Sequence, residues 1–445
     1  MALKTLLWGG FFAFCCVGAL RNPIYGIVGF VLEYIICPKL QWWDAPLDPL
    51  GLRYSLTLAA CSLAGTLANW NTLRFGRTIL HPQEKLMLLF LGIMWILTII
   101  GPETRVGNYT GVDHPALKMT KVVIFAMILT HVVTNLKNLN LLLWTFIIGS
   151  LILGMKAHSI PYSSFSRGRL ENLGGPDFND ANTFGAFMAA TLFFMGVQFI
   201  RSGWPGKLLC VYSGVFAANA MVLTRSRGAL LGFGFGLMLA MLLAPKKHRL
   251  KIFAGLLVGT LGVVSLMDTR FIERAATITQ SEDERDKSAL NRIYIWKAGV
   301  RMTLSNPQGV GPGNFYQASG RYCPELPGGM AAHNTFIQCM GELGLPGLAV
   351  YCALCVNALL ILYRANQTAR VLPSNEQKQV LWLCYGSATA LTAMQGFGLT
   401  ASVLYMEGCW WLLMLPVCIS RTVDNLVEDY SQFDGVDDYD QFDEE

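Results

Sequence analysis

Long apolar runs, separated by short polar or basic segments, fill most of this chain. A helix needs about 20 apolar residues, within a range of about 17–25, to cross the hydrocarbon core of a membrane. The first two runs are short and are joined by Arg21-Asn22-Pro23, so they form either one helical hairpin or two spans. The pattern therefore predicts about twelve or thirteen transmembrane helices. They lie near residues 5–20, 24–37, 53–70, 86–101, 119–134, 139–156, 183–200, 208–224, 227–243, 251–267, 345–363, 379–398 and 403–420.

The composition is that of a membrane protein. The 445 residues are 53% hydrophobic and 14% charged, whereas soluble domains are about 25% charged. One all-α, polytopic membrane bundle accounts for this better than several soluble domains. The first run lacks a basic start and a small-residue cleavage site, so we expect it to be retained as a membrane segment.

Basic loops predict the orientation, because short cytoplasmic loops carry an excess of Lys and Arg. The densest basic segment, Pro245-Lys246-Lys247-His248-Arg249-Leu250-Lys251, separates two strong apolar runs. By alternation, residues 201–207, residues 364–378 and the C-terminus share its cytoplasmic side. The external side then holds residues 157–182, 224–227 and 268–334. The side of the N-terminus stays open, because the first two runs are ambiguous.

These features predict four parts: transmembrane helices over 1–267, an external loop over 268–334, further transmembrane helices over 335–421, and a cytoplasmic tail over 422–445. From Asp424 onward the sequence DNLVEDYSQFDGVDDYDQFDEE holds ten acids and no Lys or Arg. Such a composition is typical of a disordered, solvated segment, with partner binding as the alternative.

The external loop is the only long polar region before the tail, and long structured loops are often functional. Residues 288–304 predict an amphipathic helix with Ile293, Trp296, Val300 and Leu304 on one stripe. The GVGPG segment at 309–313 has no preceding strand, so it predicts a tight turn rather than a dinucleotide-binding loop.

Two arginines, Arg225 and Arg227, stand between two apolar helices with almost no loop. In one interpretation they are interfacial residues that extend to lipid headgroups. In the other, one of them binds an anion in an external cavity, because a guanidinium grips phosphate with two hydrogen bonds. Their position on the side of the long loop favours the second interpretation.

His333 and Asn334 end the external loop, and a short helix begins at Thr335. A structural interpretation has Asn334 capping this helix and His333 anchoring at the interface. A functional one makes His333 a general base, because imidazole titrates at about pH 6.5 and can accept a proton from a hydroxyl. Arg292 similarly belongs to a solvated helix face or forms a second phosphate clamp. For Glu342, a structural role is the better interpretation.

Taken together and in this order, these segments resemble the O-antigen ligase / O-antigen polymerase family of membrane glycosyltransferases. The resemblance covers nearly the whole chain except the acidic tail. The N-terminal ALRNPIYGIVGFVLEYIICPKLQWW is similar to the exosortase-associated O-glycosylation ligase branch of the family. The matching segments are DANTFGAFMAA at 180–190, SRGALL at 226–231, NRIYIWKAG at 291–299, NPQGVGPGNF at 306–315 and HNTFIQCMGELGLPG at 333–347.

The resemblance implies an inverting glycosyl transfer that needs no metal or other cofactor, at the periplasmic face of the bacterial inner membrane. It implies a glycan on undecaprenyl pyrophosphate as donor, a glycan, lipid or protein hydroxyl as acceptor, surrounding membrane lipid, and no nucleic acid. By position in the family motifs, Arg227 and Arg292 are implied to bind the pyrophosphate and His333 to activate the acceptor. The implied accessory substrate-binding residues are Arg225, Asn182, Trp296, Arg301 and Asn334.

Two alternatives remain. A polymerase of the same family would extend the glycan repeat by repeat. A lipid-linked oligosaccharide transporter would belong to another class, and such transporters tend to have inverted repeats and broken helices at mid-membrane. The sequence shows no such repeat, and its polar residues gather on one side, which favours an enzyme.

Overall fold

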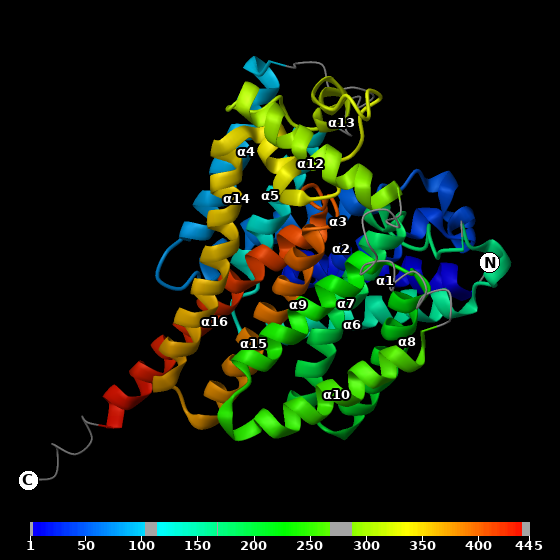
Figure 1. Ribbon diagram of the computed structural model, residues 1–445. Coiled ribbons are helices and arrows are strands. Elements are labelled where there is room, and N and C mark those ends of the chain that lie inside the picture. Colours follow the sequence, from blue (N-terminus) through cyan, green and yellow to red (C-terminus); the bar gives the residue numbers. More distant parts are fainter. Residues whose placement is uncertain (1–2, 103–113, 167, 268–286, 438–445) are drawn as a thin grey trace, which may run out of the picture.

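The computed structural model describes residues 3–102, 114–166, 168–267 and 287–437, and within these ranges it is all-helical with no β-strand (Figure 1). This confirms the predicted all-α class. The α-helices are α1 (Leu3–Arg21), α2 (Ile24–Ile36), α3 (Tyr54–Ala68), α4 (Pro82–Ile100), α5 (Pro115–Val132), α6 (Leu136–Ser159), α7 (Ala181–Arg201), α8 (Trp204–Leu223), α9 (Arg227–Leu243), α10 (Arg249–Ser265), α12 (Lys287–Ser305), α13 (Phe315–Ser319), α14 (Thr335–Thr368), α15 (Ser374–Gly398) and α16 (Glu407–Asp437). Short 3-10 helices link them at Pro38–Leu40, Trp42–Leu50, Trp70–Thr72, Tyr162–Ser164, Pro176–Phe178, Lys246–His248, Gly320–Tyr322 and Ala369–Val371.

Each predicted span coincides with a helix, but fewer helices have both the length and the apolar composition needed to cross a membrane. Within the described ranges, eight helices meet the length and composition of a span, or up to nine if the pair Ile24–Leu40 and Trp42–Leu50, bent by 97°, forms one. At about 1.5 Å per residue, the 15-residue α3 and 17-residue α9 are shorter than a hydrocarbon core of about 30 Å. The sequence prediction of twelve or thirteen spans was a count of apolar runs, and it did not apply these limits on helix length and composition.

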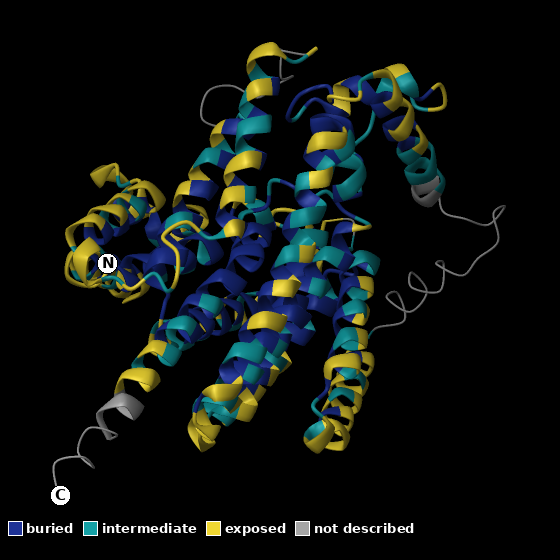
Figure 2. Ribbon diagram, turned by 90° about the vertical axis from the view of Figure 1, so that its left-hand side faces the viewer, coloured by how far each residue is buried: buried dark blue, intermediate teal, exposed yellow. Residues whose placement is uncertain are grey.

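Basic segments that are far apart in the sequence meet at one end of the bundle, which we call the basic end. There the Arg201 guanidinium donates to Gln379 Oε1 at 3.4 Å, and the His248 ring lies 5.7 Å from the Trp382 ring. Helices α12 and α13 lie at the opposite end (Figure 1), beyond the mostly buried centre of the bundle (Figure 2). The three basic loops therefore share one side, as the alternation of helices predicted.

Polar contacts at the opposite end, the α12 end, join the loop before α7 to three other helices. The Asp177 carboxylate accepts hydrogen bonds from Lys118 Nζ at 2.6 Å and from the backbone N–H of Glu407 at 3.0 Å. Tyr34 OH donates to the same carboxylate at 2.6 Å. The starts of α5 and α16 are thus held beside the loop that leads into α7.

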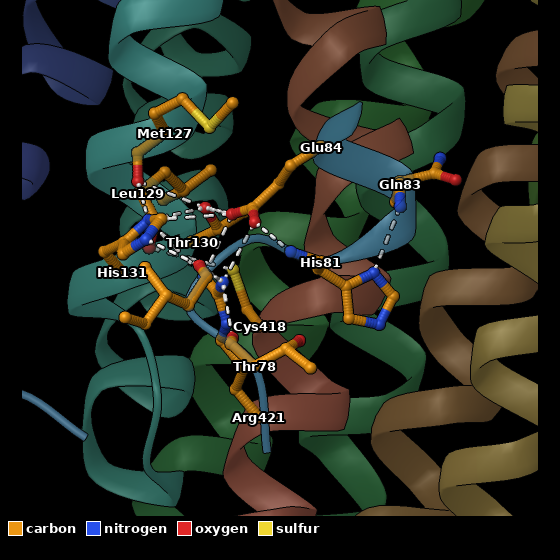
Figure 3. A network of polar contacts seen from close by, with 11 residues as sticks. Thr78, His81, Gln83, Glu84, Met127, Leu129, Thr130, His131, Cys418 and Arg421 are labelled. Carbon is orange, nitrogen blue, oxygen red and sulfur yellow. Dashed lines mark hydrogen bonds and ion pairs between the residues drawn. The ribbon is translucent and has the colours of Figure 1, made fainter. Parts of the chain in front are cut away.

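A buried ion pair joins α4 to α16 (Figure 3). Two Arg421 nitrogens each lie 2.9 Å from a different Glu84 carboxylate oxygen, and both side chains are almost fully buried. Thr130 on α5 also donates to Glu84, and the Glu84 carboxylate accepts the backbone N–H of His81 at 2.6 Å. Hydrogen bonds from three segments therefore stabilise the Glu84 charge inside an apolar bundle.

The acidic tail departs from its prediction. Helix α16 continues to Asp437, so the expectation of a disordered tail from residue 422 is wrong for residues 422–437. Arg74 lies 2.8 Å from Glu428 and 2.6 Å from Asp429, and Arg77 lies 3.4 Å from Asp424. Composition alone could not show that a neighbouring loop supplies these cations. The rest of the predicted tail, residues 438–445, lies outside the described residues.

Helix α12 packs through a different stripe from the predicted one. Val300 and Leu304 are 44% and 77% exposed, whereas Ile295, Ala298 and Met302 are fully buried. The prediction gave weight to the largest apolar side chains, but small residues determine the close contact. A Cβ at the α12 glycine, Gly299, would overlap a side chain of α14.

Helix α14 is broken where the sequence reads GELGLPG. Gly344 has φ 66° and ψ −168°, which interrupts the helix between its first two turns and its long second half. The loop after α12 fills the break: Val310 and Gly311 donate to the carbonyls of Gly341 and Glu342 at 3.0 and 2.9 Å. The predicted tight turn at 309–313 is therefore confirmed.

Glu342 holds the same turn from within α14. Its carboxylate accepts the backbone N–H of Gly313 at 2.8 Å and the hydroxyl of Tyr405. The side chain is 1% exposed. These contacts give Glu342 the structural role that the sequence favoured.

Breaking the buried ion pair on one side should destabilise the protein more than removing both partners. Arg421→Met alone leaves Glu84 buried and unpaired, which costs about 3–5 kcal/mol, whereas Arg421→Met with Glu84→Gln should recover much of this. Thermal unfolding of the purified protein in detergent measures the difference. Arg370→Met, at an exposed arginine, is the control. Equal unfolding midpoints for the single and double variants would contradict the role of the pair.

Gly344→Ala should also lower the unfolding midpoint. A Cβ there would overlap the backbone of residues 307–309, and φ 66° is a left-handed conformation that costs a side chain about 1–2 kcal/mol. The control is Gly196→Ala on α7, where no atom lies within 4 Å of the new Cβ. If both variants unfold at the same temperature, the break in α14 does not depend on this glycine.

Candidate functional site

The turn between α8 and α9 presents Arg227 at the first position of α9. Ser226 caps this helix: its Oγ accepts the N–H of Ala229 at 3.1 Å and donates to Asn182 Oδ1 at 2.9 Å. Arg225 has φ 49°, a left-handed conformation that is uncommon for residues other than glycine. Such strain persists only where the surroundings fix it, and it often marks a functional position.

Asn182 connects this turn to the loop before α7. Its Oδ1 also accepts from Arg169 Nη2 at 2.7 Å, and Arg169 Nε donates to the carbonyl of Thr224 at 3.0 Å. Asp180 caps α7 by accepting the N–H groups of Asn182 and Thr183. Asn182 was predicted to bind substrate, and its contacts place it as a bridge between two segments of the site.

The Arg225 side chain contacts the loop before α7. It is 6% exposed, its guanidinium donates to the carbonyl of Gly168, and it lies 5.9 Å from the centre of the Tyr162 ring. These contacts tie Arg225 to Tyr162 and Gly168. The predicted contact of Arg225 with substrate stays a prediction.

His333 stands immediately before the first turn of α14. Asn334 caps the helix by accepting the N–H groups of Phe336 and Ile337 at 2.9 and 3.1 Å, as its structural interpretation expected, whereas its predicted contact with substrate stays a prediction. His333 itself has φ 47°, so it shares the left-handed conformation of Arg225. The half-buried imidazole is therefore held in an unusual backbone position rather than in a relaxed loop.

Trp296 on α12 fixes the residue before this histidine. Its indole Nε1 donates to the carbonyl of Ala332 at 2.9 Å. This hydrogen bond uses the indole donor, so Trp296 positions the backbone at Ala332. The predicted contact of Trp296 with substrate stays a prediction. Arg301, further along α12, is exposed and donates to the carbonyl of Tyr322 at 3.2 Å.

The connection between α15 and α16 brings the two helix starts together. Asn334 Nδ2 donates to the carbonyl of Leu399 at 3.0 Å, and Thr335 Oγ1 donates to that of Ala401 at 2.8 Å. On the α9 side, a Cβ at Gly228 would overlap the Thr400 hydroxyl. The start of α9, with Arg227, and the start of α14, with His333, therefore contact the same few residues.

Electrostatic interactions bring the arginines of three elements into one neighbourhood. Burial lowers the pKa of the Arg169 guanidinium, and the positive charges of Arg227 and Arg292 lower it further. The carboxylates of Asp180 and Glu171 act in the opposite direction. Arginines from the 157–180 loop, α9 and α12 thus lie close enough to repel one another.

His333 belongs to the same neighbourhood. Burial lowers the pKa of its imidazole, the positive charge of Arg292 lowers it further, and Asp180 raises it. The neutral imidazole, with one nitrogen able to accept a proton, is therefore favoured at neutral pH. Arg227, Arg292 and His333, which the sequence placed far apart in the chain, meet at the α12 end.

Arg169 is a site residue that the sequence analysis missed. The available signal was its position in the 157–182 loop, which had been assigned to the same side as His333. An arginine in a polar loop has many other roles, so position alone did not single it out. Its proximity to Arg227 becomes apparent only when the loop folds over the turn between α8 and α9.

One family model matches the chain. Residues 212–352 match the model described as O-Antigen ligase. The matched range runs from α8 into α14, so it contains Arg227, Arg292 and His333 and excludes Arg169 and Asn182. No curated protein sequence matches the chain. Placement in the exosortase-associated branch stays a prediction. Residues 212–352 are therefore similar to the O-antigen ligase family.

Proposed function

We propose that the protein transfers a glycan from undecaprenyl pyrophosphate to an acceptor hydroxyl at the α12 end of the bundle, as an inverting ligase. The observation that carries the proposal is the convergence of Arg169, Arg227 and Arg292 with His333. The match of residues 212–352 to the O-antigen ligase family model supports it, because that family consists of glycosyl-transferring enzymes. Cations gathered around a base suit a reaction in which an anion leaves while a hydroxyl is deprotonated.

The arginines stabilise the leaving group. Cleavage of the bond between the sugar C1 and the phosphate oxygen transfers its electron pair to the pyrophosphate, which gains negative charge. Guanidinium groups held by helix starts and loop contacts stabilise this charge more in the transition state than in the ground state. Arg227 and Arg292 would contact the pyrophosphate directly, and Arg169 adds positive charge beside Arg227.

His333 activates the acceptor. Its neutral imidazole takes the proton of the attacking hydroxyl as the new bond forms between the acceptor oxygen and the sugar C1. Attack from the face opposite the leaving pyrophosphate inverts the configuration at C1. The left-handed backbone of His333, the Asn334 cap and the Trp296 contact with Ala332 hold the ring in position.

The distribution of basic residues supports a periplasmic site. Lys246, Lys247 and Arg249 lie in the short connection at the basic end, and short basic connections favour the cytoplasm. The α12 end would then face the periplasm of a bacterial inner membrane. A lipid-linked donor could enter from the bilayer and place its pyrophosphate among the arginines.

Alanine substitution of each site arginine should reduce transfer. Removing one charge-stabilising group from a site of this kind lowers kcat by about 10²-fold or more. The assay follows glycan transfer from a purified lipid-linked glycan to candidate acceptors by Arg169→Ala, Arg227→Ala and Arg292→Ala proteins in detergent. Wild-type rates in all three variants would exclude the pyrophosphate role.

The matched control is Lys297→Ala, which removes an exposed cation from the same helix as Arg292 and should leave transfer unchanged. Product length in the wild-type reaction separates the ligase from the polymerase. A single added glycan supports the ligase, whereas a ladder of repeats supports the polymerase.

The pH dependence of kcat/KM should report on His333. A base with a lowered pKa stays neutral as the pH falls, so the acid-side loss of activity should lie below about pH 6.5. His333→Ala should lower kcat by about 10²-fold or more and abolish this acid limb. An unchanged acid limb in His333→Ala would assign the titration to another group.

A further inference from the structure

A polar cavity of about 540 Å³ lies away from the candidate site, beside the second half of α16. It is lined by the turn between α1 and α2, the end of α3, the turn between α5 and α6, and residues 422–429 of α16. Its volume is in the range of small-molecule sites, about 300–1,000 Å³. The proposed glycosyl transfer does not use it.

Three cations line the cavity: Arg21, Arg74 and Lys137. Arg74 is held by Glu428 and Asp429 of α16 at 2.8 and 2.6 Å. By contrast, no ion pair joins Arg21 or Lys137 to a carboxylate within the described ranges, and both residues are exposed. Two cations at one opening are available to a single anion.

The wall of the cavity contains a hydrogen-bond acceptor that has no donor. Asn425 is 6% exposed, and its Nδ2 donates to the carbonyl of Thr134 at 2.9 Å. Its Oδ1 is buried and has no hydrogen-bond partner. A buried acceptor without a partner is uncommon, and a small turn of the Asn425 side chain would present it to a donor in the cavity.

Apolar side chains next to the cavity face outward. Leu20 precedes Arg21 and is 51% exposed, and Leu67, near the end of α3, is 62% exposed. Trp70 stands beside Asn69, another lining residue, and tryptophan is common where a protein meets the membrane–water interface. A ligand here has apolar surface available as well as cations and an amide.

We propose that this cavity binds the headgroup of an anionic phospholipid. The phosphate contacts Arg21 and Lys137, a headgroup hydroxyl donates to Asn425 Oδ1, and the acyl chains lie along Leu20 and Leu67. The chemistry recognised is a phosphate ester with a hydroxyl donor. A free phosphate ester shares that chemistry but lacks the chains, so lipid and soluble ligands differ in how they use the apolar rim.

Binding is tested on the full-length purified protein after lipid removal. Native mass spectrometry counts the phosphatidylglycerol, phosphatidylethanolamine or phosphatidylcholine retained from mixed micelles, with glycerol 3-phosphate and inorganic phosphate as soluble probes. We expect one tightly retained phosphatidylglycerol. The combined substitution of Arg21→Ala and Lys137→Ala should weaken it by about tenfold or more, because both cations that contact the phosphate are removed.

The matched control combines Arg249→Ala and Lys251→Ala, which remove two exposed cations elsewhere in the chain and should leave retention unchanged. A second variant acts in the opposite direction. Asp429→Asn releases Arg74 from one carboxylate and should raise the affinity for phosphatidylglycerol severalfold, which a misfolded protein would not do.

The following results would overturn the proposal. A specific anionic lipid site would be excluded if the cavity and control variants lost phosphatidylglycerol equally. It would also be excluded if all variants retained phosphatidylglycerol and phosphatidylcholine equally. Glycerol 3-phosphate binding as tightly as phosphatidylglycerol, and lost with Arg21 and Lys137, would assign the cavity to a soluble phosphate ester and overturn the lipid.

Discussion

The break in α14 is the constraint on which the rest of the site depends. A helix that stops in an apolar bundle leaves backbone groups that neither lipid nor water satisfies. Residues 307–311 supply the missing hydrogen bonds, and Glu342 adds a side-chain bond to the same turn. Because this turn follows α12 directly, the contacts also fix α12 against the helix that begins beside His333.

Burial and positive charge act together at the α12 end. Arg169, Arg227 and Arg292 come from a loop and two helices. The positive charges of Arg227 and Arg292 act on the Arg169 guanidinium. The same field, with burial, keeps His333 neutral. In the proposed reaction, the charges that bind the donor would also favour the neutral form of the base.

Sequence reasoning succeeded where a residue's role follows from local chemistry. The length of the apolar runs predicted the helices, and the glycines at 309–313 predicted the turn there. An amide side chain just before a helix offered the Asn334 cap as one interpretation. It failed where a role depends on a distant partner. The packed face of α12 depends on the small residue Gly299 meeting α14, and the order of α16 beyond residue 422 depends on Arg74 from another loop.

The sequence by itself determined an all-helical membrane bundle, the sharing of one side by its basic loops, and the identities of Arg227, Arg292 and His333 as candidates, because hydropathy, charge and residue type are local properties. Only the tertiary structure decided that these three meet, that Arg169 joins them, and that Arg225 turns toward a loop. Those outcomes depend on contacts between segments that the chain separates by tens of residues, and no local pattern encodes which segments will touch.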